Sequence, residues 1–359
     1  MRAELNSFID LKTGKPLQIR ATKECGGRVI SGMLYNSHSR YPIIRGIPRF
    51  VERTLYAYGK QSSPEKRTAD SFGHKWNEKR HAFFGERQWD ARNLREQFMA
   101  MLGCRSITEL NRTLRMSQCT LNAGCGVAWS EYLFNLNPAA QRHCIDISLA
   151  VEAAYKKTRH MPNVMISQAS IFSLPYRDAS FDLIYSLGVL HHTKSAPEAF
   201  QILAKKLKPN GLLGVYIYNI KPFLRELTDQ AIREITTRMS YQRCRKFSQG
   251  MTKLGKSLAA IKQPLLITKD IPLLGISKGR YPLQQFIYNY FLKCWYSSGQ
   301  DEAYADLVNQ DWYHPAYATH HTKEEIRAWF RQAGIPKVTC LQPKGWEHSG
   351  YFVSGRKRG

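Results

Sequence analysis

Short apolar runs alternate with helical patterns through the middle of the chain, and this alternation constrains the fold more than any other feature. The runs lie at 118–123, 142–147, 164–167, 181–187 and 211–218. Strands that alternate with helices are joined by right-handed crossovers and form a parallel sheet. We therefore expect an α/β fold that binds its ligand at the carboxyl ends of these strands.

The first run ends in a turn of small residues, "AGCG", which contains Gly124 and Gly126 and leads into a helical pattern that starts at Val127. Glycines at such a turn let the backbone approach a ligand closely. A dinucleotide-binding motif needs a third glycine three residues later, where Trp129 stands, and this turn also lacks the G-x-x-x-x-G-K-[ST] pattern of a phosphate loop. The turn is therefore expected to hold a ligand without phosphates.

A carboxylate ends the second run, twenty residues beyond Gly126. Asp146 is the last residue of the strand pattern "HCID". A carboxylate at this place can accept hydrogen bonds from both hydroxyls of a ribose. The alternative is that Asp146 caps the next helix, a role that Ser148 also fits. We favour the ribose.

Two longer segments resemble a known family. Residues 168–192, "QASIFSLPYRDASFDLIYSLGVLHH", and residues 207–219, "LKPNGLLGVYIYN", are similar to the class I S-adenosylmethionine-dependent methyltransferases, of the methyltransferase type 11 kind. The resemblance runs from about Cys119 to Asn219 and resumes near Trp312. It implies an α/β fold: a Rossmann-like seven-stranded methyltransferase sheet with a small N-terminal β module and a helical cap insertion. It also implies an enzyme that uses S-adenosylmethionine.

The resemblance further implies which residues contact the cofactor. They are Asn122, Gly124, Cys125, Gly126, Asp146, Ile147, Ser170, Ile171 and Leu187. Three positions depart from the family: position 122 is usually acidic, Ala128 replaces a third glycine, and an aspartate often stands where Ser170 does. Because charge-assisted hydrogen bonds are stronger than neutral ones, we expect the cofactor to bind with about 1–3 kcal/mol less stabilisation.

The composition limits the class of partner and the compartment. The chain of 359 residues has 53 Lys and Arg against 28 Asp and Glu, a net charge of +25, which attracts polyanions or acidic surfaces. None of the eight cysteines forms a C-x-x-C pair, which is typical of thiols in a reducing compartment. We find no signal-peptide pattern and no run of 18 apolar residues. We expect a cytoplasmic protein, at most peripheral to a membrane.

The sequence divides into a core and three accessory segments. Residues 1–55 contain two strand-like pieces and resemble a zinc-ribbon-like module, but Cys25 is the only cysteine there, so no metal is predicted. The other expected units are a helical connector at 56–117, the methyltransferase core at 118–220 and 312–359, and a helical cap at 221–311, over the acceptor site. Within the core, Thr322 and Glu325 form a capping-box pattern.

One part of the cap is strongly basic. Residues 241–280 hold nine Lys and Arg against one Asp, around a helical stripe made by Phe247, Met251, Leu254 and Leu258. Three interpretations stay open, in this order. The helix packs on the core with its basic face in solvent; it lies on an anionic membrane near a lipid-linked acceptor; or it contacts RNA, for which no known binding module is recognisable.

Methyl transfer mainly needs alignment of the acceptor with the methyl carbon. If a general base is used, His191 and His192 are the candidates, because they follow the fourth strand and imidazole titrates near neutral pH. A packing or capping role is the alternative. His320 and His321 are expected to lie exposed. The residues expected at the acceptor are Phe72, Trp76, Tyr218, Asn219, Tyr313 and Tyr317.

The sequence thus predicts methyl transfer from S-adenosylmethionine to a small metabolite, a glycan or a lipid-linked intermediate. Two other classes remain open. The basic surface would suit an RNA or protein methyltransferase, and the departures at Asn122 and Ser170 would suit a non-catalytic module that only binds the cofactor or a partner.

Overall fold

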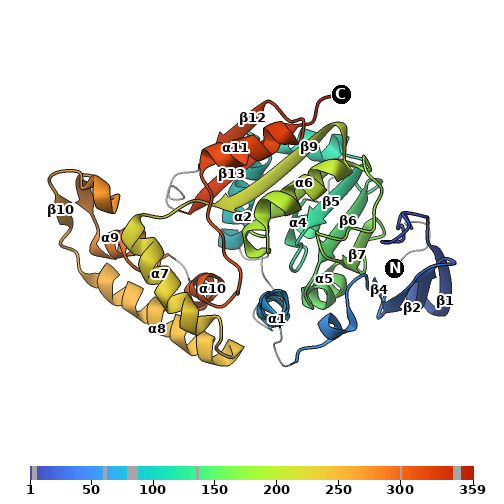
Figure 1. The fold of residues 1–359 in the computed structure, drawn as a ribbon, viewed down its shortest axis with the longest axis horizontal. Coiled ribbons are helices and arrows are strands. Elements are labelled where there is room, and N and C mark those ends of the chain that lie inside the picture. The colour runs from blue at the N-terminus through green and yellow to red at the C-terminus, as the bar shows by residue number, and fades with distance from the viewer. Residues whose placement is uncertain (2–5, 60–62, 79–87, 135–136, 300, 343–348) are drawn as a thin grey trace.

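The centre of the molecule is a seven-stranded sheet with helices on both faces (Figure 1). The computed structural model describes the chain except for residues 2–5, 60–62, 79–87, 135–136, 300 and 343–348. The strand order is β12-β13-β9-β8-β5-β6-β7. The predicted α/β fold with a Rossmann-like sheet is confirmed.

The first five core strands are parallel, as predicted. They are β5 (Cys119–Ala123), β6 (Gln141–Asp146), β7 (Val164–Gln168), β8 (Phe181–Leu187) and β9 (Leu207–Tyr218). The sheet ends in two antiparallel strands, β13 (Gly350–Arg356) beside β9 and β12 (Val338–Leu341) beside β13. Because β5 lies between β6 and β8, the direction of strand addition reverses there, and ligands bind at such a switch point.

Alternate side chains of the strands pack into two apolar layers. In β9, Leu213, Val215 and Ile217 belong to one layer, whereas Leu212 and Tyr216 belong to the other. This period of two follows from the pleat of a strand. The first layer is covered by α6 (Ala196–Lys206) and α11 (Lys323–Gln332), and the second by α2 (Gln88–Met101) and α3 (Ile107–Met116). The capping box of Thr322 and Glu325 at the start of α11 is present.

The turn after β5 is longer than the sequence suggested. The helix α4 spans Trp129–Leu133 instead of starting at Val127. Gly126 and Ala128 both have left-handed backbone conformations, with φ of +53° and +54°, and such residues cannot continue a right-handed helix. The extended turn leaves more backbone at the carboxyl end of β5. The next crossover helix, α5 (Ala150–Thr158), packs beside it.

The N-terminal segment forms a four-stranded antiparallel sheet, more strand than the two pieces expected. Its strands are β1 (Gln18–Cys25), β2 (Arg28–Tyr35), β3 (Arg40–Ile44) and β4 (Ile47–Pro48). It lies beside β7, at the right of Figure 1. The N–H of Phe50 donates to the carbonyl of Gln168 over 2.8 Å, and Arg49 donates to its side-chain oxygen, also over 2.8 Å. Within the described ranges, no three His, Cys, Asp or Glu gather as metal ligands would.

The connector begins with a 3-10 turn at Arg53–Tyr56 and α1 (Pro64–Asn77), and continues into α2 and α3. The cap forms the lobe at the left of Figure 1. Its elements are α7 (Phe223–Thr236), α8 (Tyr241–Ala260), β10 (Leu265–Ile267), η5 (Pro272–Leu274), β11 (Gly279–Tyr281), α9 (Leu283–Tyr290) and α10 (Glu302–Tyr313). Among the described helices, none has the length and hydropathy to cross a bilayer.

The long cap helix α8 packs against α10. Its buried positions are Cys244, Ser248, Thr252 and Gly255, which lie beside the apolar stripe that the sequence suggested. Phe247 and Met251 border this face and contact the cluster around Tyr313, whereas Leu254 is exposed. A Cβ on Gly255 would lie 2.4 Å from the carbonyl oxygen of Cys294, so small residues allow the close approach. The buried face of α8 therefore packs against α10 within the cap, and the three interpretations of its basic face stay predictions.

Candidate functional site

A cavity of about 530 Å³ opens at the carboxyl ends of β5, β6 and β8 and continues beneath the cap. Core, connector and cap all contribute to its walls. It brings together eight of the nine residues that the sequence assigned to the cofactor: Gly124, Cys125, Gly126, Asp146, Ile147, Ser170, Ile171 and Leu187. Their contact with a cofactor stays a prediction, but they share one wall.

The glycine turn is shaped by close neighbours on both sides. Gly124 has φ of +81°, and a Cβ there would lie 2.4 Å from a methyl carbon of Val189. A Cβ on Gly126 would lie 2.9 Å from the indole ring of Trp76, which comes from α1. Side chains at these positions would displace the residues that close the cavity, so glycine is needed at both.

Asp146 holds the turn and the start of the next helix in place. Its carboxylate accepts hydrogen bonds from the N–H of Gly126 over 3.0 Å, the N–H of Ser148 over 2.9 Å and the hydroxyl of Ser148 over 2.6 Å. Burial raises the pKa of the Asp146 carboxyl more than these hydrogen bonds lower it. The hydroxyl of Ser148, in turn, accepts from the N–H of Ala150 at the start of α5. The helix-capping alternative for Asp146 therefore does not hold.

Asn122 is the predicted cofactor residue that does not line the cavity. Its amide donates to Ser130 Oγ over 3.0 Å and to Glu131 Oε1 over 3.3 Å. Glu131 is fully buried and forms an ion pair of 2.8 Å with Arg142. An acidic residue at position 122 would place a second carboxylate against Glu131. The amide is thus required by the packing of α4, and the expected loss of cofactor affinity does not follow from this departure.

The two neighbouring histidines occupy different surroundings. His191 does not reach the cavity; its ring stacks on Tyr218 with centroids 3.6 Å apart. Within the described part of the chain, neither ring nitrogen of His191 has a hydrogen-bond partner, and burial lowers its pKa well below the usual range. The geometry therefore does not support His191 as a general base, and its role is packing.

His192 does line the cavity. Its Nδ1 lies 2.8 Å from the carbonyl oxygen of Tyr317, which can only accept, so Nδ1 must carry the proton and Nε2 the lone pair. Burial lowers the pKa of His192 to about 3, and nearby cations such as Arg233 contribute. The ring is therefore a hydrogen-bond acceptor that is hard to protonate.

Four of the six residues expected at the acceptor line the cavity: Phe72, Trp76, Tyr218 and Tyr317. The other two do not. Tyr313 is fully buried behind the wall and donates to the carbonyl oxygen of Lys293 over 2.9 Å. The side-chain oxygen of Asn219 accepts a hydrogen bond from the ammonium of Lys221, and it is Lys221 that reaches the cavity.

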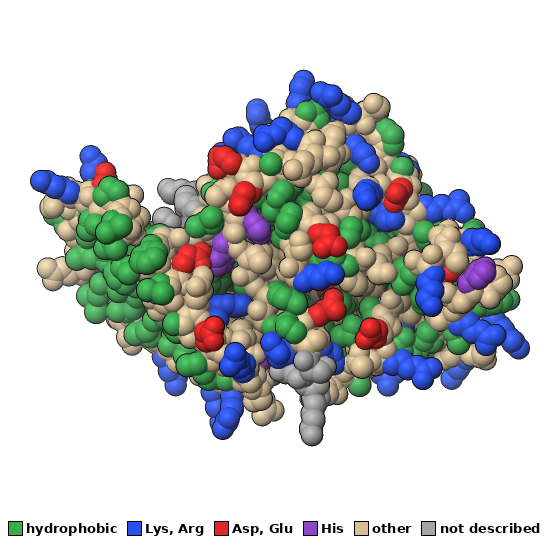
Figure 2. Space-filling model, viewed as in Figure 1, with side chains coloured by type: hydrophobic (Ala, Val, Ile, Leu, Met, Phe, Trp, Pro, Cys, Tyr) green, Lys and Arg blue, Asp and Glu red, His purple; other side chains and the backbone are tan. Residues whose placement is uncertain are grey.

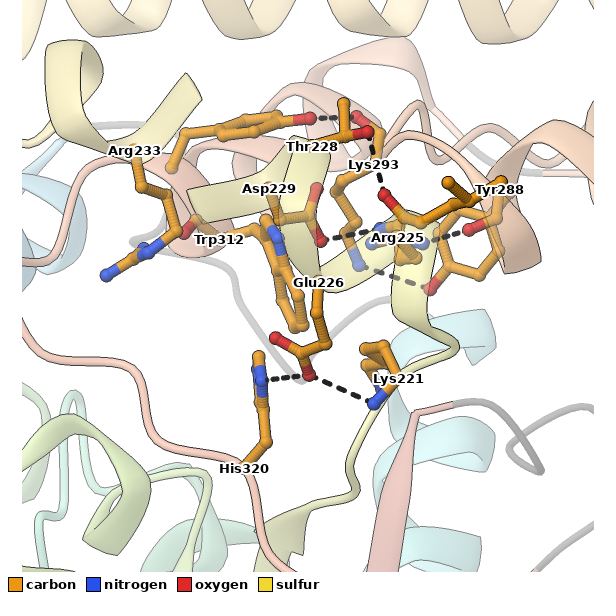
Figure 3. A network of polar contacts seen from close by, with 12 residues as sticks. Lys221, Arg225, Glu226, Thr228, Asp229, Arg233, Tyr288, Lys293, Trp312 and His320 are labelled. Atoms are coloured by element: carbon orange, nitrogen blue, oxygen red, sulfur yellow. Dashed lines mark hydrogen bonds and ion pairs between the residues drawn. The ribbon is translucent and has the colours of Figure 1, made fainter. Parts of the chain in front are cut away.

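Sequence reasoning missed the polar residues that the cap places in the cavity. The wall on the cap side is formed by Lys221, Arg225, Tyr288 and Lys293, next to Trp312, and Figure 3 shows these residues together. The sequence held two signals for them. Arg225 and Asp229 stand four residues apart on α7, and Lys293 is the sole charged residue in the aromatic run "YNYFLKCWY". Charged side chains among apolar residues are rarely buried unless they are paired.

These groups change one another's titration. The guanidinium of Arg225 donates to Asp229 over 2.5 Å and also to the carbonyl oxygen of Tyr288. Burial lowers the pKa of Lys221 well below its usual range, and the charges of Arg225 and Lys293 lower it further. Burial alone would raise the pKa of Tyr288, but the charges of Lys293 and Arg225 outweigh burial and lower it. The cap side of the cavity is therefore electropositive.

His320, expected to lie exposed, is largely buried at the edge of this group. Its Nδ1 lies 2.6 Å from Glu226 Oε1, its side chain is 13% exposed, and its ring stacks on Trp312 (Figure 3). His321 is also mostly covered, with 15% of its side chain exposed. His320 connects the core to the cap, whereas His321 contacts Glu325 and Trp329 of α11.

Comparison with known proteins gives a family match for the core segment. Residues 121–215 match the family model described as "Methyltransferase domain". The uncharacterized protein syc1184_c of Synechococcus sp. (strain ATCC 27144 / PCC 6301 / SAUG 1402/1) is 35% identical over 103 residues, which make up 27% of this chain. The chain spans about a quarter of that relative's length, 25%.

The chain is also similar to solved structures, among them two methyltransferases. The N-methyltransferase NodS from Bradyrhizobium japonicum WM9, in complex with S-adenosylhomocysteine, has a TM-score of 0.43 and 12% identity, over 82% of this chain and 100% of that one. A SAM-dependent methyltransferase from Aquifex aeolicus has a TM-score of 0.38 and 12% identity, over 82% of this chain and 99% of that one.

Proposed function

We propose that this chain is a class I S-adenosylmethionine-dependent methyltransferase and that its acceptor is a small molecule bound on the cap side of the cavity. The supporting observation is that the cofactor wall and the cap wall border one continuous cavity. The wall that carries Gly124, Gly126 and Asp146 and the wall that carries Tyr288 and Trp312 enclose the same space. Its volume of about 530 Å³ is typical of a small-molecule site.

The residues present fit the cofactor. The turn at Gly124 and Gly126 leaves space that a Cβ would fill, and the carboxylate of Asp146 stands beside it with the chemistry that a ribose needs. When bound, S-adenosylmethionine supplies an electrophilic methyl group on a sulfonium.

The protein's own contribution is then alignment and exclusion of water. The lone pair on Nε2 of His192 is suited to accept a hydrogen bond from the O–H or N–H of the acceptor and to orient the nucleophile. With a pKa of about 3, this ring is a poor base, so orientation is its role and proton removal is not. The rings of Tyr218 and Trp312 cover the site from the cap side.

One titration and one turnover assay test this proposal. Isothermal titration with S-adenosylhomocysteine is expected to give one site with a Kd on the order of micromolar. Release of S-adenosylhomocysteine is then measured with acceptor pools separated by size into small molecules, RNA and protein. Turnover with the small-molecule pool supports the proposal; turnover with RNA or protein alone contradicts it. A folded protein that binds no S-adenosylhomocysteine would instead be a non-catalytic module.

A second observation favours an acceptor held at a membrane. The cap exposes large apolar side chains on one lobe: Phe223, Leu227, Leu266 and Leu273 are 62%, 55%, 66% and 86% exposed. The 3-10 turn η5, which carries Leu273, contacts α7, which carries Phe223 and Leu227, and Figure 2 shows hydrophobic side chains gathered over the cap at the left. Contiguous apolar surface of this kind marks an interaction site.

The same lobe is basic. Lys262, Lys269, Lys278 and Arg280 are exposed in the segment that carries Leu266 and Leu273. Apolar side chains flanked by Lys and Arg are typical of proteins that contact anionic lipid bilayers. We therefore also propose that the cap rests on such a surface, which would bring a lipid-linked acceptor to the cavity. Co-sedimentation with anionic vesicles tests this.

A further inference from the structure

Three basic side chains of the cap surround one indole ring. Lys293 Nζ lies 5.0 Å from the ring centroid of Trp312, Arg225 Cζ lies 5.2 Å from it and Lys221 Nζ 5.4 Å. All three residues line the cavity and are at most 6% exposed. Figure 3 shows their side chains converging from α7, from the connection between β9 and α7 and from the segment after α9. Buried positive charge is thus concentrated on one wall.

Lys293 is held by neutral groups rather than by a carboxylate. Arg225 has Asp229 as its carboxylate partner. The ammonium of Lys293 donates to the hydroxyl of Tyr288 over 3.2 Å and lies over the rings of Tyr288 and Trp312. No carboxylate oxygen among the described residues lies within 4.0 Å of this ammonium. Neutral hydroxyl and ring contacts do not offset the cost of removing an ammonium from water.

The geometry points to an oxyanion-binding subsite: we propose that Lys293, Tyr288 and Arg225 bind a phosphate or carboxylate group of the acceptor. This inference rests on the proposed function, since it names the chemical class of the acceptor in the same cavity. The ammonium and the phenol hydroxyl supply donors on one side, and the guanidinium adds charge beside them. The lowered pKa of Tyr288 agrees with an electropositive environment that favours an anion.

The rest of the cap wall suits the remainder of such an acceptor. Trp295, Tyr304 and Trp312 line the cavity next to the cations. Aromatic faces provide apolar contact at little entropic cost, while the charged groups fix one end of the molecule. The methionyl carboxylate of the cofactor is the competing oxyanion, so the experiment must separate the two.

The test uses the full chain and inorganic phosphate as the probe. Wild type is first saturated with S-adenosylhomocysteine, then titrated with phosphate by calorimetry at constant ionic strength. The variant is Lys293→Met, which keeps the length of the side chain and removes its charge. The matched control is Lys269→Met, because Lys269 is exposed on the same lobe and outside the cavity. Acetate replaces phosphate in a parallel titration, to distinguish a phosphate-selective site from one that also accepts carboxylates.

We expect phosphate to bind wild type at one site, K293M to weaken that binding at least tenfold, and K269M to leave it unchanged. The Kd for S-adenosylhomocysteine should be the same in all three proteins. K293M should also melt at the same temperature as wild type or higher, because replacing a poorly balanced buried charge with an apolar group is neutral or stabilising.

Three results would overturn the inference. Phosphate affinity that is equal in wild type and K293M would place the anion elsewhere. A selective loss of S-adenosylhomocysteine binding in K293M would assign Lys293 to the cofactor's carboxylate. A lower melting temperature than that of K269M would make Lys293 a structural residue. If the proposed function itself were wrong, wild type would not bind S-adenosylhomocysteine, and this result is distinguishable from the three above.

Discussion

The backbone N–H of Gly126 donates to the side chain of Asp146 over 3.0 Å, and this bond joins the turn after β5 to the end of β6. The two residues stand twenty positions apart in the chain but adjoin because β5 and β6 pair in parallel, with Ala123 beside Ile145. The carboxylate thus fixes the shape of the turn as well as offering its oxygens to a ligand.

Asp146→Asn should weaken the binding of S-adenosylhomocysteine about tenfold. An amide loses the charge and presents an N–H toward donors that already face it from Gly126 and Ser148, and a lost charge-assisted hydrogen bond is worth about 1.5–3 kcal/mol. Calorimetric titration measures the effect. Asp178→Asn is the control, because Asp178 is 66% exposed and pairs with Lys206 outside the cavity. Equal affinity in D146N and wild type would show that Asp146 does not contact the ligand.

Gly124→Ala should both destabilise the protein and abolish tight cofactor binding. Alanine in a left-handed conformation costs roughly 1–2 kcal/mol, and its Cβ would also collide with Val189. Gly14→Ala provides the comparison, because Gly14 has φ of +68° with no atom within 4 Å of its Cβ position. The free energy of unfolding and the Kd for S-adenosylhomocysteine are measured for both variants. If the two lose the same stability and G124A still binds normally, the contact with Val189 is unimportant.

The stability of the protein should decrease as the pH falls below about 6.5. Burial lowers the pKa of His143 to about 4, of His192 to about 3 and of His314 to about 4. The unfolded chain therefore binds protons in a pH range where the folded protein does not. Each such histidine reduces the free energy of unfolding by up to about 1.4 kcal/mol per pH unit, from pH ~6.5 down to its folded pKa.

Urea unfolding at pH 7.5, 6.5 and 5.5 measures this slope. His143 packs among Phe8, Tyr176 and Phe181, so His143→Phe retains an aromatic ring and should make the slope shallower. His160→Gln is the control, because His160 is exposed. A slope that H143F shares with wild type would mean that His143 is protonated in the folded protein.

Leu266→Ser combined with Leu273→Ser should abolish co-sedimentation with vesicles that contain anionic lipid. Burying a leucine side chain contributes roughly 1.5–3 kcal/mol, so two substitutions remove a large part of the apolar contribution. Met116→Ser is the control, because Met116 is 68% exposed on α3, outside the cap. Wild type is expected to bind neutral vesicles weakly and to dissociate from anionic ones at high salt. Equal sedimentation of wild type and the double variant would exclude this face as the contact.

The core could be predicted from the sequence because its information is local. The strands from β5 to β9 are short, apolar and buried, and each begins or ends within a few residues of the predicted positions, as at Asp146 and Leu187. Eight of the predicted cofactor residues share one wall for the same reason, since parallel strands end at one edge of a sheet. Asn122 was assigned by resemblance, and its contact with Glu131 across the turn was invisible in the pattern.

The cap side of the site depends on contacts between distant segments. Arg225 meets the carbonyl of Tyr288 across 63 residues, and no periodicity relates these positions. The two neighbouring histidines show a second limit. His191 and His192 share a short 3-10 turn, and adjacent residues there point in different directions, so only His192 reaches the cavity. The identity of the residues was informative, but their orientation was set by packing.

The hydrogen bonds of Phe50 and Arg49 to Gln168 attach the N-terminal module to β7, and this contact affects self-association of the protein. β7 is the outermost strand on its side of the sheet, and Arg28 also reaches the chain near its start, at the carbonyl of Met161. An uncovered outer strand is a template on which another molecule can add its own strand. The four-stranded module covers the end of β7 at Gln168. A chain that lacks this module should therefore aggregate more readily through β7.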